Sequence, residues 1–410
     1  MNITIIPKKL AGTVTPPPSK SQAHRLIIAA SLAEGESTIE NVAFSQDVEA
    51  TLRCMEALGA SWEETVPGVI RVKGAGGRRS RNGALPKLDC GESGSTLRFL
   101  IPIALALRGG GVFTGHGRLL ERPQGPYVDL FSERGISWEQ GSGSITIRGA
   151  LTPGEYALPG NVSSQFFTGL FFALPLLSGE SVVVPTTNLE SAGYLAITRE
   201  AQDRFGVTIR RERGLVHRIP GPQKYRPCRC RVEADWSQAA FWYAAAQLGS
   251  AVTVTGMNPA SPQGDRVIVD MLDFSRDQPG HRSLDVCHIP DLVPPLAALA
   301  AGTGGCTRLK NAGRLRLKES DRLTTVRETL EAFGIRAEDR ADSLTIFGRE
   351  RLLGNVTIDC CNDHRIAMMA AVLATRADGP VTLTGAECVR KSYPDFWEEY
   401  KQLGGEVHVL

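Results

Sequence analysis

The sequence predicts an α/β protein of two globular domains, each assembled from three small β/α modules. Two observations support this fold class. The chain has 410 residues, 42% of them hydrophobic, which is enough for two domains with well-buried cores. One unit also recurs six times along the chain, at a spacing of roughly seventy residues. Six such repeats argue against the doubly wound nucleotide-binding fold that composition alone would allow.

Each unit begins with a predicted apolar helix. A Ser or Asp near the helix start is followed by about fifteen mostly apolar residues and then Gly, which is typical of a capped, buried helix. The six copies, in chain order, are "SKSQAHRLIIAASLAEG", "SGSTLRFLIPIALALRGG", "VSSQFFTGLFFALPLLSG", "DWSQAAFWYAAAQLGS", "DLVPPLAALAAGTGG" and "DHRIAMMAAVLATRADG".

The rest of each unit is predicted from the same alternation of patterns. A short β-type run such as "STIENV", "GVFTG" or "PVTLTG" comes next, followed by a charged amphipathic helix such as "DVEATLRCMEALG". Most copies close with two further β-type runs, as in "ISWEQGSGSITIRG". The interval of the fourth copy is shorter, roughly fifty-five residues.

The repeats also indicate where ligands bind. Each apolar helix must bury its length, so only its start can face a ligand, and helix N-termini favour anions. The first copy crowds Lys20, Ser21, His24 and Arg25 into its first turns, where cations are unfavourable unless an anion is shared. We therefore expect an anionic ligand there.

Several side chains at or between the helix starts are candidates for its site. Each has an ordinary structural explanation: serines cap helices, and "KESDR" resembles a solvated first turn. Recurrence at one structural position in different units favours function, as does the presence of Lys20, Lys318 and Lys391 among only ten lysines. The candidates are Lys20, Ser21, Arg25, Gly94, Arg98, Arg122, Ser163, Ser164, Gln165, Ser191, Tyr194, Asp291, Lys318, Glu319, Arg322, Asp363, His364, Arg365 and Lys391.

Other function classes are disfavoured by composition. The formal net charge is +2, and the most basic stretch, "GGRRSRNG", is interpreted as a solvated hairpin loop, so no nucleic-acid partner is expected. No secretory signal or membrane-spanning run is predicted, and nine cysteines without a CxxC pair suggest free thiols in a reducing compartment. We expect a cytoplasmic protein. No phosphate-loop, dinucleotide or metal-ligand motif is present, so neither a cofactor nor a metal is expected.

Seven motifs together resemble the EPSP synthase (3-phosphoshikimate 1-carboxyvinyltransferase) family: "PSKSQAHR", "SGSTLRF", "ERPQG", "SSQF", "LKESDRL", "NDHRIAM" and "KSYPDFW". The resemblance implies the enolpyruvyl transferase fold, in which each domain holds three β-α-β-α-β-β units around a pseudo-threefold axis and the active site lies in the interdomain cleft. The domains expected are residues 1–18 plus 236–410, and residues 19–235.

The resemblance also implies the reaction. The enolpyruvyl group of phosphoenolpyruvate moves to the 5-hydroxyl of shikimate 3-phosphate by addition and elimination, giving 5-enolpyruvylshikimate 3-phosphate and phosphate. Closure of the two domains is expected to exclude water. The substrates would be the only partners and the protein would be a monomer. Glyphosate occupies the phosphoenolpyruvate site in this family, so it is expected to inhibit.

Site roles carried over from the family fall into three sets. Both substrates carry a carboxylate and a phosphate, which charge-assisted hydrogen bonds would hold. The phosphoenolpyruvate ligands would be Lys20, Gly94, Arg122, Gln165, Arg322, Arg365 and Lys391. The shikimate 3-phosphate ligands would be Lys20, Ser21, Arg25, Ser163, Ser164, Gln165, Ser191, Tyr194, Asp291 and Lys318. Asp291 matches the base and Glu319 the proton donor, and Lys20 could share either role.

Two rival functions remain as alternatives. One is enolpyruvyl transfer to UDP-N-acetylglucosamine, but enzymes of that kind carry a reactive Cys before "RP", and "GHGRLLERP" has none. The other is a non-catalytic anion-binding paralogue, which would have lost Asp291, Glu319 or Lys20. Glu92 and Arg314 stand where many relatives have Asn, which bears on affinity rather than on the reaction.

Overall fold

The computed structural model describes residues 1–77, 83–272 and 280–410, and these form two compact units. Unit 1 comprises Met1–Pro17 and Ala234–Leu410, and unit 2 comprises Pro18–Glu233. Each unit has its own hydrophobic core. The basic stretch at residues 76–83, predicted to be a hairpin loop, falls largely outside the described residues.

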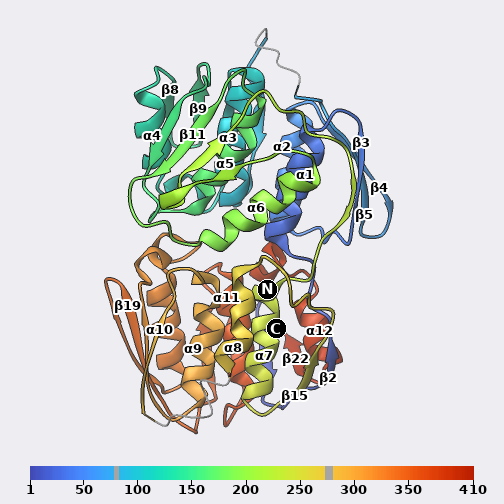
Figure 1. Ribbon diagram of the computed structural model, residues 1–410. Helices are drawn as coiled ribbons and strands as arrows, with labels where there is room; N and C mark the ends of the chain where they lie inside the picture. Colours follow the sequence, from blue (N-terminus) through green and yellow to red (C-terminus); the bar gives the residue numbers. More distant parts are fainter. Residues whose placement is uncertain (78–82, 273–279) are drawn as a thin grey trace. The chain divides into compact units, whose positions relative to one another are not determined.

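Unit 2 contains three four-stranded sheets of one design (Figure 1). In each sheet the first two strands are parallel and the remaining pairs are antiparallel. In sheet order the strands are β14 (Arg229–Arg231), β3 (Glu36–Glu40), β5 (Val69–Lys73) and β4 (Ser61–Val66); β6 (Lys87–Asp89), β7 (Gly110–Thr114), β9 (Ser144–Arg148) and β8 (Ser137–Gln140); and β10 (Glu155–Leu158), β11 (Ser181–Pro185), β13 (His217–Ile219) and β12 (Arg210–Arg211).

Six helices in the described residues of unit 2 connect these strands. They are α1 (Lys20–Leu32), α2 (Gln46–Ala57), α3 (Gly94–Arg108), α4 (Gly125–Ser132), α5 (Ser164–Ala173) and α6 (Ala192–Arg204). They pack largely against one another, α3 against α5 and α1 against α6. Helix α5 is shorter than the apolar run predicted, because the chain changes to a 3₁₀ turn at Leu174–Leu176. Pro175 lies in that turn and cannot donate the backbone hydrogen bond that would continue an α-helix.

Unit 1 repeats the design with one shortened module. Its strands are β2 (Ala11–Val14) and β15 (Ala251–Val254); β16 (His281–Asp285), β17 (Gly305–Lys310), β19 (Ser343–Gly348) and β18 (Arg336–Arg340); and β20 (Val356–Asp359), β21 (Val381–Thr384), β1 (Ile3–Ile6) and β22 (Glu406–Val409). Its helices are α7 (Trp236–Gln247), α8 (Ile268–Leu272), α9 (Val293–Gly302), α10 (Arg322–Ala332), α11 (His364–Ala374) and α12 (Phe396–Gln402).

The short fourth interval of the sequence corresponds to the parallel pair β2–β15, which among the described residues has no third strand. The predicted repeat is therefore confirmed. The module with only two strands among the described residues coincides with the shorter interval of the fourth copy. In the middle of unit 1, helices α7, α9 and α11 pack against one another (Figure 1). The two ends of the chain meet in one sheet, where β1 pairs with β22 and, for example, Ile5 lies opposite Val407.

Long-range strand pairing completes the modules. In unit 2, β14 joins the first sheet beside β3, with Cys230 opposite Ile39, although almost two hundred residues separate them in the chain. All nine cysteines are free and are buried or half-buried, as the sequence indicated. No helix of the described residues combines the length and apolarity needed to cross a membrane.

Candidate active site

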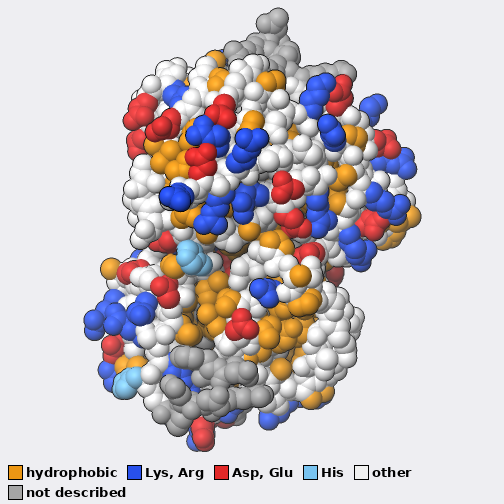
Figure 2. Space-filling model, in the orientation of Figure 1, with side chains coloured by type: hydrophobic (Ala, Val, Ile, Leu, Met, Phe, Trp, Pro, Cys, Tyr) orange, Lys and Arg blue, Asp and Glu red, His pale blue; other side chains and the backbone are white. Residues whose placement is uncertain are grey.

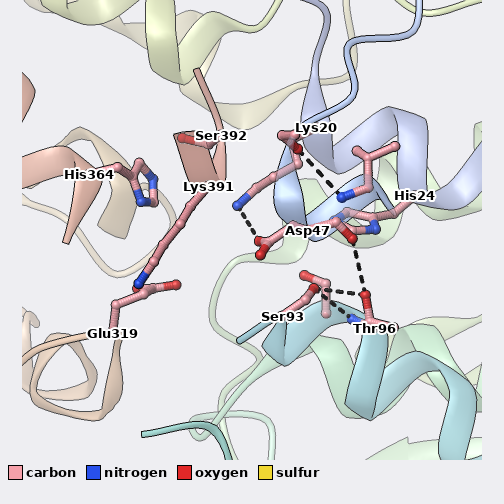
Figure 3. Close-up of polar contacts among 12 residues, drawn as sticks. Lys20, His24, Asp47, Ser93, Thr96, Glu319, His364, Lys391 and Ser392 are labelled. Carbon is pink, nitrogen blue, oxygen red and sulfur yellow. Dashed lines mark hydrogen bonds and ion pairs between the residues drawn. The ribbon is translucent and has the colours of Figure 1, made fainter. Parts of the chain in front are cut away.

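The start of α1 lies against the start of α2 in unit 2. Ser19 caps α1 by accepting a hydrogen bond from the Gln22 backbone N–H. The ammonium group of the next residue, Lys20, contacts Oδ2 of Asp47 at 2.7 Å, and Figure 3 shows the two side chains pointing toward one another. Asp47 therefore balances one of the two cations that the sequence crowds into this helix start.

Arg25, the second cation, has neutral partners. It is 2% exposed, and it donates to the Ser21 carbonyl at 2.6 Å, to Thr198 Oγ1 at 2.8 Å and to Thr168 Oγ1 at 3.4 Å. The Tyr194 ring lies 5.9 Å from the guanidinium carbon. Burial lowers the pKa of Arg25 to about 9, so it stays protonated at neutral pH. None of the acceptors that the described part of the chain gives it is a carboxylate, and a buried cation of this kind favours an anion.

Polar side chains join the starts of α1, α2 and α3 into one network. His24 Nδ1 bonds Thr51 Oγ1 at 2.7 Å, Thr51 bonds Thr96 Oγ1 at 2.7 Å, and Thr96 donates to Ser93 Oγ at 2.8 Å. Figure 3 shows Ser93 and Thr96 together at the start of α3. Burial, with Lys20 and Arg25 nearby, lowers the pKa of His24 well below its usual value, so the imidazole is neutral.

The start of α3 is packed against a loop arginine. A Cβ atom added to Gly94 would lie 2.7 Å from an NH1 atom of Arg122 and 2.9 Å from its Cζ. Arg122 is itself 8% exposed. Only glycine lets the backbone approach the guanidinium this closely, so Gly94 and Arg122 are juxtaposed.

The start of α5 completes the unit 2 cluster. Ser163 caps the helix by accepting from the Gln165 backbone N–H at 3.3 Å, so the ordinary capping role of this serine is observed. Gln165 Oε1 accepts from Arg98 at 2.9 Å, and its Nε2 donates to Ser95 Oγ at 2.9 Å. Ser164 is buried, as is Ser191, which precedes α6 in the left-handed conformation with φ of 54°.

Unit 1 gathers its predicted residues around Asp291. This carboxylate lies in a 3₁₀ turn, Pro290–Leu292, immediately before α9. Its Oδ1 contacts Arg322 NH1 at 3.1 Å and Lys318 Nζ at 3.4 Å, and its Oδ2 contacts Arg365 NH2 at 3.1 Å. One carboxylate therefore meets three cations from two segments, residues 318–322 and the start of α11.

Arg322 is the centre of this second cluster. Its guanidinium, 1% exposed, reaches Glu319 Oε2 at 2.7 Å and Asp363 Oδ2 at 2.9 Å. Burial opposes the charge of Arg322, but the carboxylates of Asp363, Glu319 and Asp291 outweigh it and raise its pKa. Asp363 also caps α11, accepting from the Arg365 N–H at 3.0 Å.

The other cations of this cluster, Arg365, Lys391 and Lys318, have further contacts. Arg365 donates to Ser237 Oγ at 3.0 Å, which links the starts of α11 and α7. Lys391 Nζ donates to the Asn362 carbonyl at 2.8 Å, and Figure 3 shows its side chain extending toward Glu319. Burial lowers the pKa of Lys318 to about 8, although the Asp291 carboxylate partly opposes this.

The chemistry of the two clusters differs. The unit 2 cluster gathers the cations Lys20, Arg25, Arg98 and Arg122, with Asp47 paired to Lys20, which makes it suited to binding anions. The unit 1 cluster places Asp291 and Glu319 among cations, which provides carboxylates for proton transfer. No group of three or more His, Cys, Asp or Glu side chains in the described chain could hold a metal ion.

Comparison with known proteins identifies the family. The family model of EPSP synthase (3-phosphoshikimate 1-carboxyvinyltransferase) matches residues 5–400. The chain belongs to the EPSP synthase family. A 3-phosphoshikimate 1-carboxyvinyltransferase from Clostridium kluyveri is 43% identical over 99% of this chain and 98% of that protein. One from Clostridium acetobutylicum is 41% identical with the same coverage.

Solved structures confirm the enolpyruvyl transferase fold. EPSP synthase from Acinetobacter baumannii matches with a TM-score of 0.79 and 25% identity, covering 100% of both chains. The enolpyruvyl transferase NikO from Streptomyces tendae matches with a TM-score of 0.79 over 99% of this chain and 98% of that one, at 18% identity. The latter is a likeness of fold alone.

The two positions where this EPSP synthase family member carries unusual charges have local partners. Arg314 donates to the Cys287 carbonyl at 2.6 Å. Glu92 lies 3.8 Å from His116, and a Cβ on Gly117 would come within 2.8 Å of its carboxyl carbon.

Some residues of the clusters were not singled out from sequence. Asp47 pairs with Lys20 and Ser237 contacts Arg365, and neither was among the candidates. The one sequence signal for Asp47 is its position just after Ser45, which caps α2. An acid there is explained by the helix dipole alone, so its pairing with Lys20 depends on the tertiary structure.

Proposed function

We propose how this chain carries out the 3-phosphoshikimate 1-carboxyvinyltransferase reaction, the shikimate-pathway step in which phosphoenolpyruvate and shikimate 3-phosphate give 5-enolpyruvylshikimate 3-phosphate and phosphate. The proposal assigns the binding of the two anionic substrates and the movement of two protons to particular residues. The observation that carries it is Arg25, a buried guanidinium whose hydrogen-bond partners in the described part of the chain are all neutral.

Shikimate 3-phosphate is assigned first. Arg25 and Ser21 would bind its carboxylate, which would balance the buried charge of Arg25. Ser163, Ser164 and Ser191 would donate to its phosphate, with Gln165, Tyr194, Lys318 and Lys20 as further ligands. Each hydrogen bond to a charged group contributes about 1.5–3 kcal/mol, so a few such bonds account for micromolar binding.

Phosphoenolpyruvate is assigned to the remaining cations. Its ligands would be the Gly94 N–H and the side chains of Lys20, Arg122, Gln165, Arg322, Arg365 and Lys391. The close approach of Gly94 to Arg122 supports this assignment, because together they present N–H donors to one small anion. Cations around the phosphate also stabilise it as it leaves.

The proton transfers are assigned to the unit 1 carboxylates. In the addition step, the 5-hydroxyl oxygen bonds to C2 of the enol, Asp291 accepts the hydroxyl proton and Glu319 donates a proton to C3. In the elimination step, Glu319 takes a proton back from C3, the bond from C2 to the phosphate oxygen breaks, and the departing phosphate receives the proton held by Asp291. Lys20 could share either transfer.

The assignment is tested by measuring phosphate release. It should require both phosphoenolpyruvate and shikimate 3-phosphate, and Asp291→Ala should lose turnover while still binding shikimate 3-phosphate in calorimetry. Asp270→Ala, an exposed acid on α8, is the matched control and should keep full activity. Full activity of Asp291→Ala would remove it as the base.

Glyphosate tests the phosphoenolpyruvate assignment separately. We expect it to compete with phosphoenolpyruvate, because Gly94 leaves room at this position, and undiminished turnover at millimolar glyphosate would contradict this. We further expect a monomer in the cytoplasm, which light scattering on a size-exclusion column and cell fractionation would check.

A further inference from the structure

We propose that Arg98 is a positioning residue for this reaction. It fixes the side-chain amide of Gln165 so that an N–H group, rather than the carbonyl oxygen, faces the substrates, and it holds the loop that carries Arg122. The inference rests on the proposed function, in which Gln165 and Arg122 bind phosphoenolpyruvate.

Arg98 contacts two separate segments through all three of its guanidinium nitrogens. On α3 and only 4% exposed, it donates from NH1 to Gln165 Oε1 at 2.9 Å. From NH2 it donates to the Pro123 carbonyl at 2.9 Å, and from Nε to Gln124 Oε1 at 3.4 Å. The guanidinium carbon lies 4.8 Å from the centre of the Phe166 ring, a cation–π distance that further fixes the side chain.

The direction of the Gln165 amide follows from the chemistry of Arg98. A guanidinium has donors only, so the amide atom that faces it must be the oxygen. The amide nitrogen then points the other way and donates one hydrogen to Ser95 Oγ at 2.9 Å. Gln165 is half-buried, and among the described residues its second amide hydrogen has no acceptor. This N–H can therefore be offered to a carboxylate or phosphate oxygen.

The same arginine also supports the neighbourhood of Arg122. The side-chain oxygen of Gln124 accepts from Arg98, and its Nε2 donates a hydrogen bond to the Arg122 carbonyl at 3.2 Å. With the bond from Arg98 to the Pro123 carbonyl, this fixes the backbone on the C-terminal side of Arg122. Two proposed phosphoenolpyruvate ligands from different modules thus depend on one buried side chain.

Close packing of α3 against α5 sets the register that this arrangement needs. The Tyr127 hydroxyl bonds both the Arg98 carbonyl, at 3.0 Å, and the Phe166 carbonyl, at 2.8 Å. A Cβ on Gly169 would lie 2.4 Å from the Arg98 carbonyl oxygen, so glycine is required for the helices to approach this closely. The positions of Arg98 and Gln165 are therefore fixed by the backbone.

The test compares steady-state kinetics of the full-length enzyme and its variants. Arg98→Lys keeps the charge but cannot reach three acceptors, and we expect the KM for phosphoenolpyruvate to rise about tenfold or more, with kcat changed much less. Arg108→Met is the matched control, because Arg108 lies on the same helix and donates to the Leu58 carbonyl at 2.7 Å. Its kinetics should equal those of the wild type.

Three further variants, two single and one double, separate positioning from folding. Gln165→Glu places an oxygen where the amide offers N–H, so it should lose more phosphoenolpyruvate affinity than Gln165→Ala. When Arg98→Lys is added to Gln165→Ala, the further rise in KM should be smaller than the rise in the wild-type background. A general loss of folding would instead lower the Tm. The fold-changes in KM caused by Arg98→Lys and by Gln165→Ala would then multiply in the double variant.

Two results would overturn the inference. One is an Arg98→Lys enzyme with the wild-type KM for phosphoenolpyruvate, and the other is a Gln165→Glu enzyme that binds phosphoenolpyruvate as well as Gln165→Ala. Failure of the proposed function is distinguishable, because wild type and Arg108→Met would then release no phosphate from the substrate pair.

Discussion

Replacing Gly94 with alanine should weaken phosphoenolpyruvate binding by a steric displacement of Arg122. The added methyl carbon would lie 2.7 Å from NH1 and 2.9 Å from Cζ of this arginine, whereas ordinary contacts begin near 3.4 Å. The guanidinium must therefore move by about 0.7 Å. Gly94 is the first residue of a regular helix, where alanine is favoured over glycine, so the backbone itself should not be destabilised.

The expected magnitude follows from hydrogen-bond geometry. A displacement of about 0.7 Å stretches a hydrogen bond of about 2.8 Å to about 3.5 Å, which is beyond useful range. Loss of one bond to a charged group costs about 1.5–3 kcal/mol. At 1.4 kcal/mol for each tenfold change, the KM for phosphoenolpyruvate should rise between about tenfold and about a hundredfold. The KM for shikimate 3-phosphate should change little, because Arg122 is not among its proposed ligands.

The assay is initial-rate phosphate release with each substrate varied in turn. Gly125→Ala is the matched control, since Gly125 also begins a helix, α4, and a Cβ there would meet nothing within 4 Å. This control should keep both KM values. An unchanged KM for phosphoenolpyruvate in Gly94→Ala would refute the reasoning, because it would mean that Arg122 can move without losing a substrate contact.

Two predictions concern pH. Lys318 has a pKa of about 8 and faces Asp291, Glu319, Arg314 and Arg322. Above pH 8 it loses the charge proposed to hold shikimate 3-phosphate, so kcat/KM for this substrate should fall there. Lys318→Arg should move this fall to higher pH. A wild-type profile that is flat to pH 10 would contradict this role. Burial raises the pKa of Glu399 from 4.5 to about 7, so the folded protein binds its proton more tightly than the unfolded chain. That contribution to the free energy of unfolding is present below pH 4.5 and is lost as pH rises toward 7. The urea concentration at the unfolding midpoint should therefore decline over this pH range in the wild type, and Glu399→Gln should remove the decline.

The sequence was sufficient to predict the modules because their signals are local. Apolar runs and turn glycines recur along the copies, and Ser19, Ser93, Ser163, Asp235 and Asp363 all accept hydrogen bonds at helix starts. Helix α9 is the exception, because its N-cap is Leu292 and Asp291 does not cap it. Even the truncated fourth module was visible as a shorter spacing. What these signals have in common is that each depends on residues within one turn or one strand of each other.

The pairings between modules could not be predicted in this way. Strand β14 joins β3 from the far end of unit 2, and neither strand's sequence specifies its partner. The bond from Arg98 to Gln165 spans 67 residues, and that from Arg322 to Asp363 spans 41. Such contacts are decided by how the modules pack, so a sequence can indicate that a charged residue is unusual without indicating which residue balances it.

The balance of charge explains why the first helix start tolerates its cations. Lys20 is neutralised by Asp47, so its placement requires no ligand. Among the described residues, the hydrogen-bond acceptors of Arg25 are hydroxyl and carbonyl oxygens, which satisfy its N–H groups but not its charge. Burying a charge without a counter-charge is costly, and the cost is recovered when an anion binds. Shikimate 3-phosphate alone should therefore raise the Tm of the wild-type enzyme, whereas an analogue without the carboxylate should do so much less.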